Sequence, residues 1–253
     1  MSRWLKVPRL TLALAALCLI TASCSTSEPQ VRFVNAIQNT NSYGGALDVK
    51  VNGTKEFTNV EFAAAAASTY TTVRAGGETI EALEYPADTT TIFNGTIVPK
   101  AGTQYTLIAT GFAGGGGNKV LLLSDPDNNT APAPGKVNIR VINASPSGPL
   151  GGGAPVDIYV VPIGSSLASS DKIVSSLAYQ SASTYQTVSY NSNFENEWNY
   201  TLTVTLANSV TPVFSQNFAA GSSTTGSIRT FVLTDVANVD EMSAQTIILN
   251  DLN

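Results

Sequence analysis

The charged residues best placed for chemistry in this sequence recur in two similar segments. Asp48 and Asp157 each stand second in a run of alternating apolar residues, and Arg32 and Arg140 each stand second in another such run. A single carboxylate on a strand supplies too few oxygens for calcium, and its recurrence in both segments is typical of a structural role. We therefore expect two structural ion pairs, Arg32 with Asp48 and Arg140 with Asp157, each within one copy.

Catalysis by the common triads is excluded because their residues are missing. The chain has no histidine, and its two cysteines are Cys18 and Cys24. Ser-His-Asp and Cys-His catalysis therefore lack their base, and the usual zinc and copper sites lack their ligands. We predict a protein that is not an enzyme and that uses no cofactor or metal. An envelope enzyme of unrecognised type stays open as an alternative.

One oxygen-rich segment, Asp125 to Asn129, is a candidate for calcium at a joint. The sixth and twelfth positions counted from Asp125 are Thr130 and Lys136, where an EF-hand needs Gly and Glu. Calcium would therefore need another geometry. The other interpretation, which we favour, is a polar turn.

Residues 1–23 have the pattern of a secretory signal peptide. Three basic residues (Arg3, Lys6 and Arg9) precede an apolar run over 10–20 and a short stretch of small residues. As a helix with a rise of ~1.5 Å per residue, the run would span only about 17 Å, less than the ~30 Å hydrocarbon core. The pattern therefore indicates a cleaved signal and not a permanent membrane span.

The cleavage site resembles the lipobox of bacterial lipoproteins, in which a small residue precedes a cysteine that is acylated and becomes residue one. Thr21-Ala22-Ser23-Cys24 fits at Ala22 and Ser23, whereas Thr21 replaces the usual Leu, Val or Ile. The resemblance implies lipidation (palmitate) at Cys24 and stable anchoring by two acyl chains. In a Gram-negative cell, Ser25 resembles the signal for the outer membrane. Cleavage without lipid, which would give a secreted protein, stays open.

Charge and cysteine content limit the partners of the mature chain. Ten basic and 18 acidic residues follow residue 23, which gives a formal charge of −8, and no Lys/Arg cluster occurs among them. Nucleic acid is therefore not an expected partner. Cys24 is the only cysteine left, so no intramolecular disulfide can form. We expect the membrane as a partner through the lipid anchor, and an envelope protein or a glycan as a ligand.

The sequence contains an internal duplication. Four segments recur in the same order: 31–36 as 139–144, 47–51 as 156–160, 67–73 as 182–188, and 121–125 as 247–251. Between the copies, a polar stretch with two prolines has the composition of a linker. We predict a signal peptide (1–23), a tether (24–30), a first domain (31–126), a linker (127–136) and a second domain (137–253).

Each copy alternates between apolar and polar residues with a period of two, which predicts half-buried strands. About seven short strands per copy, separated by Gly, Pro, Asn and Asp, predict an all-β fold of two tandem immunoglobulin-like antiparallel β-sandwiches. The expected strands are 31–36, 47–51, 69–74, 78–84, 91–97, 104–111, 118–124, 137–144, 155–162, 184–190, 198–206, 211–218, 228–235 and 244–249.

The repeated motifs resemble those of the bacterial domain-of-unknown-function family 4397 (DUF4397). They are Asn143-Ala144-Ser145-Pro146 and Val156-Asp157-Ile158-Tyr159-Val160 in the second copy, with the counterparts Val31 to Ala36 and Leu47 to Val51 in the first. The resemblance implies tandem β domains in the cell envelope and implies no activity.

Three functions follow as hypotheses. The first is a non-enzymatic, lipid-anchored envelope protein that acts as a structural or binding module for proteins or glycans. The second is the enzyme of unrecognised type. The third is a periplasmic chaperone or assembly subunit that uses an exposed strand edge.

Overall fold

The computed structural model describes residues 27–38, 45–63, 69–112, 117–125, 131–146, 150, 153–190, 200–220, 226–235 and 244–251. The predicted signal peptide and Cys24 lie outside the described residues, as does most of the candidate calcium segment Asp125 to Asn129.

The described residues of the first copy form a β-sandwich, which we call sandwich 1. Its two sheets have the strand orders β4-β1-β7-β8 and β3-β2-β5-β6. The strands are β1 (Gln30–Gln38), β2 (Leu47–Val51), β3 (Thr54–Val60), β4 (Thr71–Thr72), β5 (Glu78–Glu84), β6 (Thr91–Ile97), β7 (Gln104–Phe112) and β8 (Lys119–Ser124).

The described residues of the second copy form sandwich 2, in which β9, β16 and β17 correspond to β1, β7 and β8. One sheet has the order β12-β9-β16-β17 with β13 also paired to β9, and the other has the order β11-β10-β14-β15. The elements are β9 (Lys136–Asn143), β10 (Val156–Pro162), a 3₁₀ helix (Ser169–Asp171), β11 (Lys172–Leu177), β12 (Ser181–Ala182), β13 (Gln186–Ser189), β14 (Tyr200–Leu206), β15 (Pro212–Phe218), β16 (Ser227–Asp235) and β17 (Ala244–Asn250).

The all-β prediction is confirmed, with two differences. Each copy contains one parallel pair, β1 with β7 and β9 with β16, where the sequence predicted antiparallel sheets. The two-residue edge strand β12 was also missed, as were two longer edge strands, β3 and β11. Their polar sequences, Thr-Lys-Glu-Phe-Thr-Asn-Val and Lys-Ile-Val-Ser-Ser-Leu, bury only one residue each, so the apolar alternation that reveals a strand is weak there.

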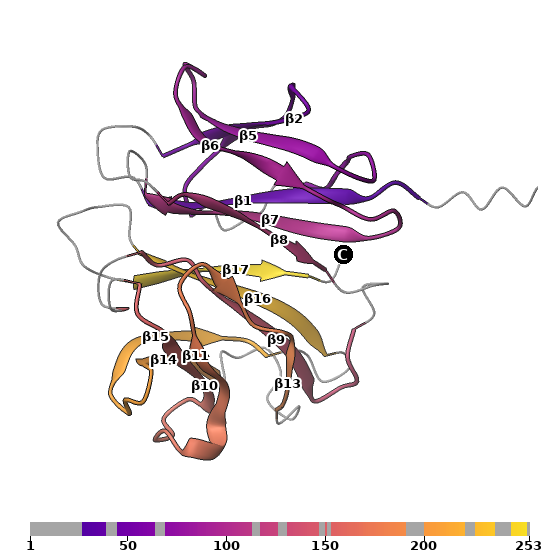
Figure 1. The fold of residues 1–253 in the computed structure, drawn as a ribbon. Helices are drawn as coiled ribbons and strands as arrows, with labels where there is room; N and C mark the ends of the chain where they lie inside the picture. Colours follow the sequence, from indigo (N-terminus) through magenta and orange to yellow (C-terminus); the bar gives the residue numbers. More distant parts are fainter. Residues whose placement is uncertain are drawn as a thin grey trace, which may run out of the picture.

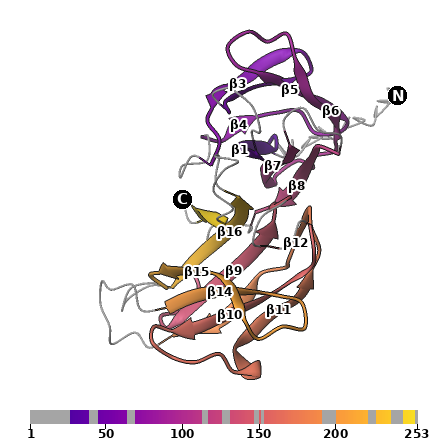
Figure 2. The ribbon, with the colours of Figure 1, turned by 90° about the vertical axis from the view of Figure 1, so that its left-hand side faces the viewer.

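The four sheets stack in four layers, and the first strands of both copies lie in the two middle layers (Figures 1 and 2). The residues that face inward within each sandwich make two separate cores, one around Phe33 and Leu107 and the other around Phe231 and Leu202. A third core lies between the sandwiches and joins both copies: Val34, Ala36, Ile108, Leu121, Ile142, Ala144, Val232, Ile247 and Leu249. The middle sheets are therefore buried on both faces.

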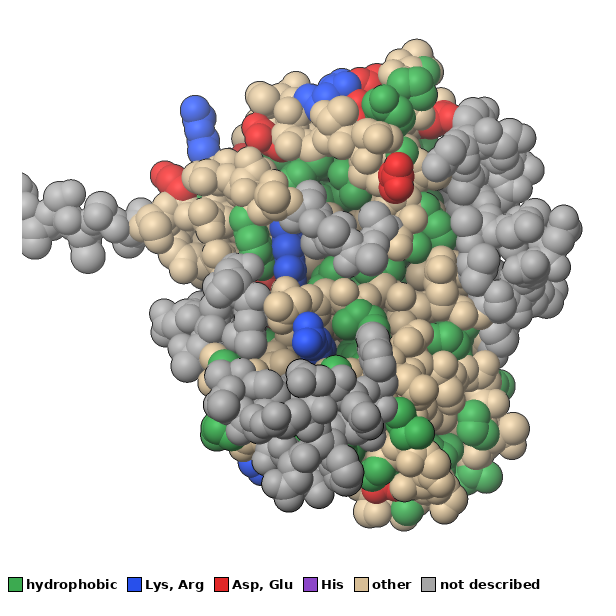
Figure 3. Space-filling model, turned by 180° about the vertical axis from the view of Figure 1, so that it is seen from behind, with side chains coloured by type: hydrophobic (Ala, Val, Ile, Leu, Met, Phe, Trp, Pro, Cys, Tyr) green, Lys and Arg blue, Asp and Glu red, His purple; other side chains and the backbone are tan. Residues whose placement is uncertain are grey.

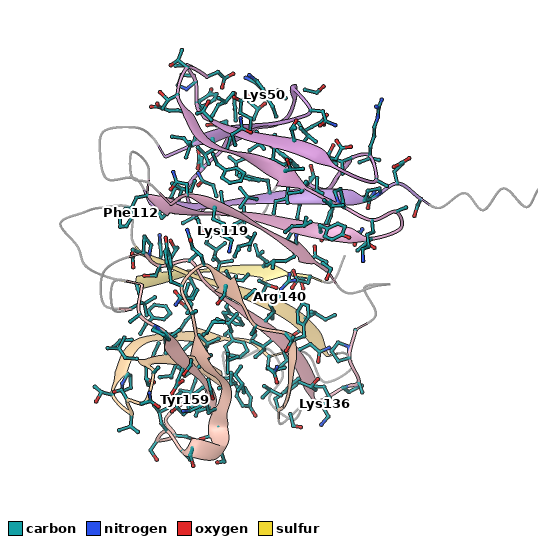
Figure 4. The ribbon with its side chains drawn as sticks, in the orientation of Figure 1. Lys50, Phe112, Lys119, Lys136, Arg140 and Tyr159 are labelled. Carbon is teal, nitrogen blue, oxygen red and sulfur yellow. The ribbon has the colours of Figure 1, made fainter. Side chains whose placement is uncertain are left out.

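The ends of the stack differ. The first described residues, Ser27 to Pro29, lie where β1 begins (Figure 1). Asp251, which pairs with Arg32, and Asp125, which pairs with Arg140, lie at this end too. We call it the tether end. Phe112 and the β14–β15 turn at 207–211 lie at the opposite end, which we call the far end (Figures 1 and 4).

Candidate functional site

The repeated aspartates lie in equivalent places, next to an irregularity in an edge strand. Asp157 Oδ1 accepts the backbone N–H of Ser176 at 2.8 Å, and Asp48 Oδ1 accepts that of Asn59 at 2.7 Å. Asn59 and Ser176 have positive φ angles of 53° and 50°, where non-glycine residues are uncommon. Each carboxylate therefore fixes a bulged edge strand, which matches the structural role that the duplication predicts.

The predicted partners of these aspartates were wrong. Asp48 pairs with Lys55 at 2.5 Å, and Asp157 pairs with Lys172 at 2.6 Å. Each lysine belongs to the edge strand beside its aspartate, β3 or β11. The arginines point toward the interface between the sandwiches, whereas the aspartates bind the edge strands of the outer sheets, so the predicted pairs do not form.

The arginines bridge the two sandwiches instead. Arg32 Nη2 binds the Asp251 carboxylate, and Arg140 Nη2 lies 2.7 Å from Asp125 Oδ1. Asp125 follows β8 and Asp251 follows β17, so each arginine reaches across the interface to the end of the other copy. Figure 4 shows Arg140 at the boundary between the middle sheets.

Two threonines and two tyrosines complete this network in the same symmetric way. Arg32 Nε donates to Thr106 Oγ1 at 2.8 Å and Arg140 Nε donates to Thr230 Oγ1 at 3.0 Å. The threonine hydroxyls donate in turn to the aspartate of their own copy, at 2.7 Å in sandwich 1 and 2.6 Å in sandwich 2.

The tyrosines cover the guanidinium groups. The centroid of the Tyr70 ring lies 5.1 Å from the Arg32 guanidinium carbon, and that of the Tyr185 ring lies 4.7 Å from the carbon of Arg140. Tyr70 donates to Asp125 at 2.7 Å and Tyr185 donates to Asp251 at 2.9 Å. The four side chains of the two ion pairs are at most 6% exposed. A buried charge that is paired and hydrogen-bonded in this way holds its partners tightly, because separation would leave it unsolvated.

The surroundings raise the pKa of one arginine and of both tyrosines in this network. Burial disfavours the charge on Arg32, but Asp125 and Asp251 outweigh burial and raise the pKa of the guanidinium. Burial, together with Asp125, raises the pKa of the Tyr70 phenol, and burial also raises that of Tyr185. These directions keep the Arg32 guanidinium charged and both phenols neutral, as their hydrogen bonds to Asp125 and Asp251 require.

A serine and a lysine have the spacing of one class of acyl-transfer enzyme and escaped the sequence prediction. Ser169 and Lys172 stand in a Ser-x-x-Lys arrangement. Lys172 Nζ donates to Asp157 Oδ2 at 2.6 Å and lies 5.4 Å from the Tyr159 ring centroid. The hydrogen bond to Asp157 raises the pKa of Lys172. A lysine held in its charged form cannot act as the base that such a mechanism requires.

Sandwich 2 carries a groove on the outer face of the β10-β14-β15 sheet, with a volume of about 500 Å³. Hydroxyl groups of Thr201, Thr203 and Ser215 lie on strands β14 and β15, and Val161 comes from β10. Pro162 at the end of β10 and Pro212 at the start of β15 also line the groove, and the loop after β10 and the β14–β15 turn supply Gly164, Ser165, Ser166, Leu167 and Val210. None of the lining residues is charged, so the groove suits a neutral ligand.

Sandwich 1 does not repeat this surface. Lys50 and Tyr159 occupy equivalent positions on β2 and β10 (Figure 4), and Lys50 pairs with Glu81 at 3.9 Å on the outer face of its sheet. A separate hollow of about 540 Å³ near the tether end is lined by Glu28, Glu56, Glu78 and Arg74 among others. From behind, charged side chains gather on sandwich 1, in the upper half, while the described surface of sandwich 2 is mostly uncharged (Figure 3).

Metal and membrane-spanning features are absent from the part of the chain that the structure describes. Its acidic side chains form no group of three that could hold a metal. It also contains no helix long and apolar enough to cross a membrane. Cys24 and all of the candidate calcium segment except Asp125 lie outside this part, so lipidation and calcium binding stay predictions.

Comparisons with known proteins show a family match over the first copy. No curated protein matches the chain. A solved structure from Bacteroides ovatus, named a "putative adhesin", is 14% identical, with 88% of this chain and 92% of that chain covered and a TM-score of 0.25. A "putative cell adhesion protein" from Bacteroides fragilis is 9% identical, with 89% and 97% covered and a TM-score of 0.24. A family model described as "Domain of unknown function (DUF4397)" matches residues 29–150. Over these residues the chain matches the family that its repeated motifs predicted.

Proposed function

We propose that this protein is a non-enzymatic binding module of the bacterial cell envelope, anchored by lipid on Cys24, that binds a neutral segment of a protein or a glycan. The predicted signal peptide and lipobox support the anchor. The repeated arginines and aspartates all form ion pairs inside the fold, which supports a structural role for them.

The groove on sandwich 2 is the observation that carries the binding role. It is concave and uncharged, although the mature chain has a formal charge of −8. Its hydroxyl groups can donate and accept hydrogen bonds, and Val161, Leu167 and Val210 add apolar contact. The two copies share their scaffold but differ at this face, where sandwich 1 carries the Lys50–Glu81 pair.

A photo-crosslinking experiment tests this proposal. A benzoylphenylalanine residue replaces Ser215, which is exposed in the groove, or Asn94, which is exposed at the equivalent position of β6 in sandwich 1. Each variant is produced in the native bacterium, irradiated in intact cells and recovered from the envelope.

We expect one dominant crosslinked product from the Ser215 position and several-fold less from the Asn94 position. Protease or glycosidase digestion of the product then tells a protein ligand from a glycan. Equal yields at both positions, or no product at Ser215, would contradict a binding role for the groove.

A further inference from the structure

The tether end of sandwich 1 is built so that very little free chain separates it from the proposed anchor. Ser27 already belongs to the fold, because its carbonyl accepts the N–H of Gly102 at 2.6 Å. The carbonyl of Pro29 accepts the N–H of Val73 at 3.0 Å, and Gln30 donates to Thr103 at 3.1 Å. The segment from Ser27 to Gln30 is thus held between two turns.

These two turns form one surface around the incoming chain. They cover residues 73–77 and 98–103, and the N–H of Gly76 joins them through the carbonyl of Pro99 at 3.0 Å. The carboxylate of Glu28, which lies between them, accepts the N–H of Ala75 at 3.2 Å. The turns therefore keep a fixed position relative to residue 27, and both surround the point where the chain enters.

The length of the tether limits how far these turns can lie from the lipid. Three residue steps separate Cys24 from Ser27, and a fully extended chain covers at most about 3.6 Å per residue, or about 11 Å in total. The headgroup layer on each side of a bilayer is about 5–8 Å thick. Only a few ångströms remain once the chain has crossed that layer.

The side chains on this surface suit a headgroup layer. Arg74 and Lys100 are exposed, one on each turn, and Val98 beside them is 61% exposed. Basic side chains are attracted to phosphate groups near a membrane surface, and an apolar side chain can enter the boundary between headgroups and acyl chains.

We propose that the turns at 73–77 and 98–103 rest against the phospholipid headgroups of the membrane that carries the anchor. This inference rests on the proposed lipid anchor at Cys24. The network between the sandwiches transmits the orientation to sandwich 2, so the far end, with Val210 in the β14–β15 turn, points away from the membrane.

Fluorescence quenching at two matched valines tests the orientation. Val98 lies at the tether end and Val210, 81% exposed, lies at the far end. In the acylated full-length protein the thiol of Cys24 is blocked by lipid, so Val98→Cys or Val210→Cys supplies the only free thiol for an environment-sensitive dye. Each labelled protein is reconstituted into phosphatidylglycerol and phosphatidylethanolamine vesicles that contain a lipid with a nitroxide on its headgroup.

We expect the nitroxide to quench the dye at position 98 several-fold more than the dye at position 210. Equal quenching, or stronger quenching at 210, would overturn the orientation. Mass spectrometry of the purified protein reports acylation separately. Absence of acyl chains would refute the anchor itself, whereas acylated protein with equal quenching would refute only the contact between the turns and the headgroups.

Discussion

The substitution Arg140→Met probes the lock between the sandwiches most directly. Arg140 and Asp125 are 4% and 0% exposed, and Arg140 also donates to Thr230 and to the Ser124 carbonyl. Removing one member of a buried ion pair costs about 3–5 kcal/mol, because the other charge stays buried without its partner. Asp125 would keep Arg32 Nε at 3.9 Å and the hydroxyl of Tyr70, so we expect the lower part of that range, about 3 kcal/mol.

Urea unfolding of the mature chain with Cys24→Ala measures this loss. A slope of about 1–3 kcal/mol per molar urea converts about 3 kcal/mol into a midpoint lowered by 1 M or more. Lys172→Met is the matched control, because it also removes a cation from an aspartate. The Lys172 side chain is 27% exposed, and Asp157 keeps the N–H groups of Ser176 and Asn208.

The control should lower the urea midpoint much less, because ion pairs of exposed side chains contribute little to stability. A loss for Arg140→Met that is no larger than the loss for Lys172→Met would refute the idea that the network locks the sandwiches. Two separate unfolding transitions in the variant, against one in the parent, would support that idea independently.

Three further predictions concern pH and packing. Burial would raise the pKa of Asp157, but its hydrogen bonds outweigh burial and lower it. The ionised carboxylate therefore stabilises the fold fully above the unfolded-state pKa of about 4, and this stabilisation is lost as pH falls through the folded-state pKa. Unfolding free energies measured from pH 6 to pH 2 should fall less steeply in Asp157→Asn than in the parent. Burial raises the pKa of Tyr185, so the unfolding free energy should decline as pH rises above about 10. Tyr185→Phe removes a hydrogen-bond donor from Asp251 and should cost about 1–3 kcal/mol at neutral pH. An unchanged urea midpoint for Tyr185→Phe would contradict this role of the phenol. A Cβ on Gly226 would lie 2.4 Å from the Lys136 carbonyl oxygen, whereas one on Gly77 would meet nothing within 4 Å. Gly226→Ala should therefore lower the unfolding free energy by about 1–3 kcal/mol, and Gly77→Ala should leave it unchanged. Equal unfolding free energies for the two variants would contradict this.

Most of the fold could be predicted because burial alternates along the strands. Val137, Ile139 and Val141 face the core of sandwich 2, and this period of two is visible in the sequence. The edge strands β3 and β11 bury too little for the same signal, and a parallel pairing of β1 with β7 leaves no mark on either strand alone.

The partners of the arginines could not be predicted from a single copy. Arg32 and Asp48 recur together, which suggests a pair, but the sequence does not tell which sheet faces which. The signal that identifies the true network was present: Tyr70 recurs as Tyr185, and Asp125 recurs as Asp251. An interface between two copies related by symmetry keeps residues in both copies, and these four lie on it.

The groove could not be predicted, because its lining comes from strand and loop residues far apart in the sequence. Threonine and serine on alternate strand positions are common on any solvent face. Only the turn that carries Val210 and the loop that carries Leu167 make this face concave.

Metabolic labelling with palmitate tests the central claim, that this is a lipid-anchored envelope protein, most directly. Cells that produce either the natural chain or Cys24→Ala are grown with labelled palmitate, and the protein is recovered from membrane and soluble fractions. We predict label on the natural chain in the membrane fraction, and an unlabelled, released Cys24→Ala variant. Equal labelling of the two, or a natural chain without label, would contradict the claim.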